Sequence, residues 1–184
     1  MSISSTNNRN DYTGNGAVDT YSYTFKIFSD TDLLVTVRDT NNTESTLALT
    51  TDYTVTGAGD ESGGSIVLVN ASQNWIESDG DLKTGYTISI RRVRPLTQTT
   101  DIRNQGEYFA EIHEDAFDHG VMISQQQQDE IDRSMKLPET IDPNDFSVEL
   151  PSTMAANAGK AIVVNPDGDG LALGASAVGL TLPV

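Results

Sequence analysis

The residue types best suited to chemistry are two histidines and the acids near them. His113 and His119 are the only histidines of the chain. Four acidic residues surround them: Glu111, Glu114, Asp115 and Asp118. Helical zinc sites place two histidines four positions apart on one face, whereas these two are six apart and fall on different faces. A symmetric trimer could gather three copies of one histidine around its axis, but a solvated helix face is the interpretation we prefer.

A second candidate is the segment from Asn165 to Gly170, which has the acid and glycine spacing of the first half of a calcium loop. Such a loop needs Asp at its first position and a bidentate Glu at its twelfth, where this chain has Asn165 and Ser176. Asn, Asp and Gly also form tight turns, so we expect a turn here. The sequence shows no nucleophile elbow, no glycine-rich phosphate loop and no spacing that brings two acids together. We therefore predict no catalytic residues, no metal site and no cofactor, in a protein that is not an enzyme.

The third candidate is a cluster of arginines in a strongly acidic chain. The chain has 11 basic and 27 acidic residues, which give it a net charge of -16. Four of the basic residues fall close together, at Arg91, Arg92, Arg94 and Arg103. They either pair with this chain's own carboxylates or form a docking patch for an acidic partner, because arginine is enriched at protein interfaces. Both interpretations stay open at this point.

Charge and composition narrow the class of protein. A surface this acidic repels nucleic acid and anionic lipids, so we expect no nucleic acid and no membrane as partners. Cysteine is absent, which excludes disulfides and thiolate sites. The first residues lack the apolar core of a signal peptide, and no run approaches the ~18 apolar residues of a membrane helix. We expect a soluble protein that is made in the cytosol.

The arginines follow a region with the two-residue alternation of β-strands. Residues 1–19 are polar, show no periodicity and are expected to form a flexible N-terminal arm, or an arm that a partner orders. Residues 20–95 then contain six short strand-like segments with no helical run between them, as in an antiparallel β-sandwich or barrel. Trp75 lies in a loop of this region. It either caps the core, which we prefer, or anchors an interface.

A linker and a helix are expected over residues 96–137. Apolar residues recur three or four positions apart from about Phe109, and Pro138 stops the helix. Apolar content falls in the C-terminal half, which contains four consecutive glutamines, and such a helix is marginal alone in water. We therefore expect it to pack against copies of itself in a trimeric bundle with buried polar layers. The candidate core positions are Ile112, Ala116, Ile123, Gln127 and Ile131.

Residues 138–184 are rich in proline, acids, alanine and glycine, and are expected to be a linker with a short β-hairpin. Residues 161–164 and 171–173 are strand-like pieces on either side of the turn that begins at Asn165. The small apolar residues from Gly174 to Val184 are expected to be a tail that binds a partner, or the point at which a longer chain was cut.

Several of these segments, in this order and spacing, resemble the N-terminal, virion-attaching domain of tail fibres and tailspikes of short-tailed phages of the T-seven type. The resemblance covers about residues 20–138 and rests on six segments: Asp52–Val55, Ile88–Arg92, Leu96–Asp101, Phe109–Glu111, Glu114–Asp118 and Gln125–Gln127. Gly159–Gly168 is similar to a linker element that is common in phage fibre proteins.

The resemblance implies a homotrimer whose β domain docks on the phage tail, where adaptor and nozzle proteins meet, while its helices bundle and lead to a shaft. The four clustered arginines then become candidate tail-docking residues. The long shaft and receptor-binding tip of the family have no counterpart in this sequence. The chain is therefore either an anchor that holds a separate fibre or spike, or the N-terminal part of a longer fibre.

The sequence thus predicts a mainly β protein with one helix: a small antiparallel β-sandwich, a trimerising α-helix and a C-terminal tail that contains a β-hairpin. The predicted function is that of a structural protein of the virion tail, a trimeric anchor or adaptor between the tail and a downstream tail fibre or tailspike. The alternative is a receptor- or glycan-binding module, which needs a concave, aromatic-lined site. The polysaccharide depolymerases that resemble this family carry a long β-helix. A chain of 184 residues cannot hold such a β-helix beside this domain.

Overall fold

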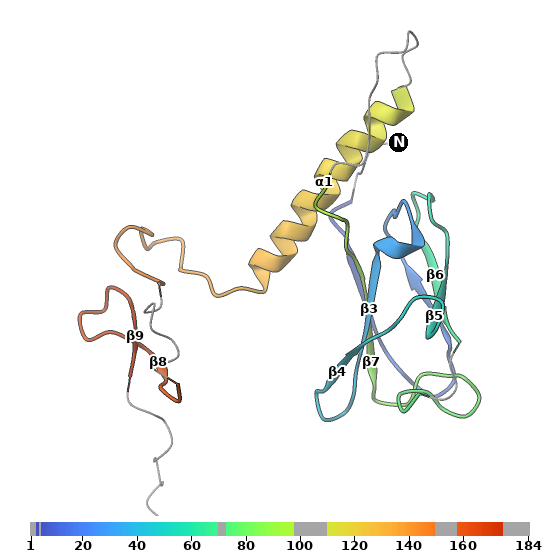
Figure 1. Ribbon diagram of the computed structural model, residues 1–184, viewed down its shortest axis with the longest axis horizontal. Coiled ribbons are helices and arrows are strands. Elements are labelled where there is room, and N and C mark those ends of the chain that lie inside the picture. The colour runs from blue at the N-terminus through green and yellow to red at the C-terminus, as the bar shows by residue number, and fades with distance from the viewer. Residues whose placement is uncertain (1–2, 4, 70–72, 98–109, 150–157, 175–184) are drawn as a thin grey trace, which may run out of the picture. The chain divides into compact units, whose positions relative to one another are not determined.

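The computed structural model describes residues 3, 5–69, 73–97, 110–149 and 158–174. The chain divides into two compact units, residues 1–133 and residues 134–184. The first unit contains strands β1 to β7, the short 3-10 helix η1 and the helix α1, and the second contains strands β8 and β9 (Figure 1).

A four-stranded antiparallel sheet in the order β1-β7-β3-β4 forms one layer of the first unit. Its strands are β1 (Arg9–Thr13), β7 (Thr87–Arg92), β3 (Leu33–Arg38) and β4 (Glu44–Thr46). The central strands β3 and β7 bury every second residue, at Val35, Val37, Ile88 and Ile90. Their other face is polar, which is the two-residue alternation that the sequence predicted for these two strands.

A tight turn joins β3 to β4. The side chain of Asp39 accepts hydrogen bonds from the backbone N–H groups of Asn41 and Thr43, each at 2.8 Å. Asn42 has a φ of 65°, a left-handed conformation that asparagine tolerates better than most residues. The residue types at these positions therefore favour the turn that the structure shows.

A three-stranded antiparallel sheet in the order β2-β6-β5 forms the second layer. Its strands are β2 (Thr20–Tyr23), β6 (Gly64–Leu68) and β5 (Tyr53–Thr56). Strand β6 begins at Gly64, where a Cβ atom would lie 1.9 Å from the carbonyl oxygen of Thr56. Only a residue without a side chain allows β5 and β6 to approach this closely.

The two sheets lie face to face and enclose one hydrophobic core (Figure 1). Trp75 belongs to this core with 4% of its surface exposed, which confirms that it packs inside rather than anchoring an interface. The predicted mainly antiparallel β class with one helix is confirmed. Over the residues that the structure describes, the two sheets do not join into a closed barrel.

Strand β1 lies within residues 1–19, where the sequence predicted a flexible arm. It pairs with β7 over its whole length, from Arg9 opposite Arg91 to Thr13 opposite Thr87. The Tyr12 ring packs 5.4 Å from the ring of Tyr21, measured between centroids. The strand is ordered by its partner, because its polar sequence has little strand preference of its own.

Helix α1 (Ala110–Asp132) belongs to the same compact unit as the two sheets. Three of its residues are buried: Asp118, His119 and Met122. Only one of the three is apolar, so the helix does not attach to the sheets through an ordinary hydrophobic stripe.

The second unit contains the predicted hairpin, formed by β8 (Ile162–Val164) and β9 (Leu171–Leu173). The backbone N–H of Asn165 donates to the carbonyl oxygen of Gly170 at 2.9 Å, and Gly168 has a φ of 76°. The side-chain amide of Asn165 donates to Asp169 Oδ1 at 2.6 Å. These contacts confirm that the calcium-like segment is a turn. The predicted partner-binding tail from residue 175 onward lies outside the described residues.

Candidate functional site

Strand β7 brings three arginines to one place. Its last residues, Arg91 and Arg92, point to opposite faces of the sheet, and Arg94 follows two positions later. The backbone N–H of Val93 donates to the carbonyl oxygen of Asp32 at 2.7 Å, which fixes the chain where it leaves the sheet. All three arginines contact helix α1. We call this contact the joint; it comprises Lys26, Asp32, Arg91, Arg92, Arg94 and the helix residues Asp118, His119, Met122, Gln125, Gln126 and Asp129.

Arg92 is the buried centre of the joint, with 2% of its surface exposed. Its Nη1 donates to the carbonyl oxygen of Lys26 at 2.9 Å, and its Nη2 donates to Oε1 of Gln125. The guanidinium also lies 5.6 Å from the centre of the Phe25 ring, a cation–π distance. Burial, and then the neighbouring charge of Arg94, lower the pKa of Arg92 to about 10, so it is still charged at neutral pH.

Arg94 connects the sheets to His119. Its Nη1 forms an ion pair with Asp32 Oδ2 at 2.5 Å, while its Nε and Nη2 lie 3.2 and 2.7 Å from His119 Nδ1. Arginine has no acceptor, so Nδ1 accepts these bonds and the imidazole carries its proton on Nε2. Burial, and then the charge of Arg94, lower the pKa of His119, which keeps it neutral at pH 7.

Asp32 is positioned by the short helix η1 (Asp30–Asp32). Its Oδ2 accepts the backbone N–H groups of Phe28 and Ser29, each at 3.0 Å, and Ser29 completes a capping box with it. The carboxylate is almost fully buried, so it both closes this turn and provides the counter-charge for Arg94. Removing either partner of this pair would leave a buried charge unpaired.

Lys26 is a second buried cation, and it holds the first half of α1. Its Nζ lies 2.8 Å from Glu61 Oε1, 3.2 Å from Asp118 Oδ2 and 3.8 Å from Asp115 Oδ1. Burial acts to lower the pKa of Lys26, but the hydrogen bonds to Glu61 and Asp118 outweigh it and the pKa is raised. Asp118 also accepts the backbone N–H of Ile3 at 3.0 Å, which ties the N-terminal segment to the helix.

Arg91 holds the other end of the helix. Its Nη1 lies 2.7 Å from Asp129 Oδ2 and 2.8 Å from Glu130 Oε1. Arg133 reaches the same two carboxylates from the end of the helix, at 3.1 and 2.5 Å. The two arginines and two acids form one network at a partly exposed site, where each pair contributes little alone.

Two of the four glutamines also belong to the joint. Gln125 Nε2 donates to the carbonyl oxygen of Ser5 at 2.8 Å, and the backbone N–H of Arg94 donates to Gln126 Oε1 at 2.7 Å. The sequence predicted that the glutamines form polar layers between copies of the helix. Gln125 and Gln126 instead face the chain's own β region, while Gln127 is exposed and remains available for that role.

Away from the joint, helix α1 exposes apolar side chains among polar ones. Large apolar side chains with more than 40% of their surface exposed lie along it: Ile112, Phe117, Val121 and Ile131. At 3.6 residues per turn, the five predicted core positions lie away from the centre of the joint face, at Ile112, Ala116, Ile123, Gln127 and Ile131. None of the five is buried in the single chain.

The structure brings together three of the four arginines that the sequence singled out, through contacts with this chain's own acids, histidine and glutamines. Arg103 lies outside the described residues. The sequence did not identify Lys26 or Asp32, and it named Asp118 only as an acid near the histidines, because the partners of these residues are far apart along the chain. Among the described residues there is no group of three His, Cys, Asp or Glu side chains that could hold a metal, and no helix long and apolar enough to cross a membrane.

Comparison with known proteins gives a relative for most of the chain. No family model matches the sequence. Over 138 residues the chain is 45% identical to the tail spike protein of Salmonella phage epsilon15, a match that covers 75% of this chain. Most of this chain is a tail-spike-related sequence. The match covers only 12% of the phage protein, so this chain corresponds to a small part of that spike.

Proposed function

We propose that this chain is a structural, non-enzymatic protein of a phage tail: a homotrimeric anchor or adaptor that attaches a tail fibre or tailspike to the virion. The observation that carries the proposal is the 45% identity to a phage tail spike protein over three quarters of the chain. The resemblance to the attachment domain of T-seven-type fibres points the same way. The joint also supports a structural role, because its charged side chains hold a helix in place and do not pair a nucleophile with a base.

The exposed apolar side chains of α1 support the trimeric part of the proposal. A helix that fixes one face to its own β region by polar contacts and leaves apolar side chains on the other can bury these against other copies. The core of such a bundle would be Ile112, Ala116, Ile123, Gln127 and Ile131. Because the joint fixes one face of each helix to its own β region, the β regions would lie on the outside of the bundle.

The four arginines have different positions in this proposal. Arg92 and Arg94 are engaged in the joint, so they would affect attachment by holding the helix in place. Arg91 also lines a surface groove and could reach a tail protein directly. The partners that we propose are the adaptor and nozzle proteins of the tail on one side and a downstream fibre or spike on the other.

Light scattering on the full chain, combined with detection of the chain in purified phage particles, tests the proposal. We expect a mass three times the 19.8 kDa of one chain at micromolar concentration. The double substitution Ile123→Glu and Ile131→Glu should give a monomer, because it places charge in the bundle core. Val69→Glu, which changes an exposed apolar residue just after strand β6, should leave the trimer intact. A monomeric wild-type chain, or one absent from particles, would contradict the proposal, and glycan binding by the isolated chain would favour the receptor-binding alternative.

A further inference from the structure

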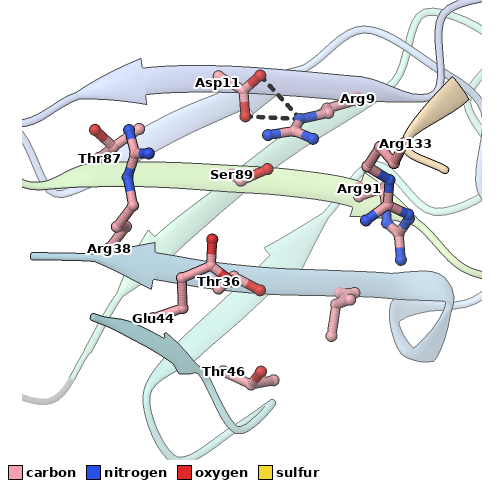
Figure 2. A pocket seen from close by; sticks show the side chains of 11 residues that line it. Arg9, Asp11, Thr36, Arg38, Glu44, Thr46, Thr87, Ser89, Arg91 and Arg133 are labelled. Atoms are coloured by element: carbon pink, nitrogen blue, oxygen red, sulfur yellow. Dashed lines mark hydrogen bonds and ion pairs between the residues drawn. The ribbon is translucent and has the colours of Figure 1, made fainter. Parts of the chain in front are cut away.

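The outer face of the four-stranded sheet carries a polar groove that lies outside the joint. Residues of all four strands line it, and Arg133 lines it from the end of helix α1 (Figure 2). Its volume is about 480 Å³, within the ~300–1,000 Å³ that is usual for ligand sites. The groove therefore has room for a ligand of several residues or rings.

The groove has a floor of short hydroxyl side chains and arginines at its margins. Thr36, Thr87 and Ser89 lie on the central strands β3 and β7. Figure 2 shows Arg38 toward one end, Arg91 and Arg133 toward the other, and Arg9 on the neighbouring strand β1. Hydroxyl and guanidinium groups are both donors to carboxylate oxygens, and guanidinium groups bind carboxylates in a forked geometry.

The charges around the groove balance one another, whereas the chain as a whole is strongly acidic. Four of the chain's 11 basic residues line the groove, together with two of its 27 acidic residues, Asp11 and Glu44. Two further acids, Asp129 and Glu130, pair with Arg91 and Arg133 at one end, while physiological salt screens acids that lie more than about 8 Å away. The groove therefore lacks the excess of acids that the chain carries as a whole.

Much of the donor capacity of these arginines is still available. Arg9 meets Asp11 through Nε, and Arg91 meets its two acids through Nη1, whereas a guanidinium carries five N–H groups. Arg38 lies opposite Glu44 in the β3–β4 register but forms no ion pair with any described residue. Arg38 is thus the donor best placed to meet an incoming carboxylate.

We propose that this groove binds an acidic, extended polypeptide segment of a protein partner. The inference rests on the proposed function, because that function makes the partner the tail protein to which the chain attaches. A polypeptide fits better than a glycan, because the residues that line the groove include no aromatic ring on which a sugar could stack. Binding would use the guanidinium forks for carboxylates and the hydroxyl floor for the peptide backbone.

Fluorescence anisotropy with a labelled octaglutamate peptide tests the groove on the full chain. Arg38→Gln and Thr54→Glu change the net charge by the same amount, but Thr54 lies exposed on β5, in the other sheet. We expect Arg38→Gln to weaken octaglutamate binding roughly tenfold, the equivalent of losing one charge-assisted contact, while Thr54→Glu stays close to wild type. Arg38→Lys should restore part of the affinity, because it keeps the charge but not the fork.

Three results would overturn the inference: no binding of octaglutamate, equal loss in Arg38→Gln and Thr54→Glu, or tighter binding of oligogalacturonate than of octaglutamate. The last would identify an anionic glycan as the ligand. Incorporation of the wild-type chain into phage particles is scored separately. If particles contain the chain but octaglutamate does not bind, the groove is refuted and the proposed function stands. If octaglutamate binds but particles lack the chain, the proposed function is refuted and the groove stands.

Discussion

The contact between the two sheets and the contact between the sheets and helix α1 differ in chemistry. Aliphatic and aromatic side chains such as Val35, Ile66 and Ile90 fill the first. In the second, the helix buries one apolar residue, Met122, and is otherwise held by ion pairs and hydrogen bonds. The sheet core gains its free energy from apolar surface removed from water, at about 25 cal/mol per Å².

A polar joint contributes less net stability but fixes geometry. Pairing in a buried site roughly offsets the cost of taking two charges out of water, so the pair stabilises little compared with an apolar contact. Breaking the pair is costly because one charge then stays buried alone. The two contacts therefore have different roles. The sheet core makes this unit stable, whereas the joint sets where α1 lies and which of its faces points outward.

The largest effect is expected in the sheet core. Ile90→Ala removes a fully buried side chain from the central strand β7 and should lower the free energy of unfolding by about 4 kcal/mol. Because β7 pairs with both β1 and β3, amide protection should fall throughout the sheets and in the helix together. Denaturant unfolding followed by tryptophan fluorescence measures the loss, since Trp75 lies in the same core. A loss confined to one strand would show that the two sheets do not unfold as a unit.

A smaller and more local effect is expected at the joint. Arg94→Met keeps an apolar stem but leaves Asp32 and His119 without their shared donor, which should weaken helix docking by about 3 kcal/mol. Hydrogen exchange should show faster exchange in α1 while the β3 and β7 amides stay protected.

Arg133→Met is the matched control for Arg94→Met, because Arg133 is exposed and its pairs lie within the helix end. We expect it to change helix exchange by less than about 0.5 kcal/mol. If Arg94→Met lowered the protection of sheet and helix amides equally, the joint would be part of the core rather than a separate contact.

The same contrast explains what could be predicted from sequence. Alternation in β3 and β7 and the turn residues from Asn165 are local patterns, and the structure confirms both. The joint has no local signature: Lys26 and Asp118 are 92 positions apart, and Arg92 and Gln125 are 33 apart. Strand β1 was missed for a related reason, since Arg9 to Thr13 become a strand only by pairing with β7.

The smallest effect is expected from pH, and it should act on the joint alone. Because the pKa of His119 is lowered in the folded chain, the unfolded state binds a proton first as the pH falls below the ordinary value of 6.5. The contribution of neutral His119 is therefore complete above pH 6.5 and is lost as the pH falls through its lowered pKa. A protonated His119 would also place a proton on Nδ1, where Arg94 donates. Helix exchange should speed up in mild acid, before the sheets are affected.

His119→Gln tests whether this pH dependence comes from His119. A glutamine oxygen can still accept from Arg94 but does not titrate, so the pH dependence of helix exchange near and below pH 6.5 should flatten. His113→Gln is the control for replacing a histidine of the same helix that is not buried in the joint. An identical profile in wild type and His119→Gln would show that His119 does not cause the pH dependence of helix exchange.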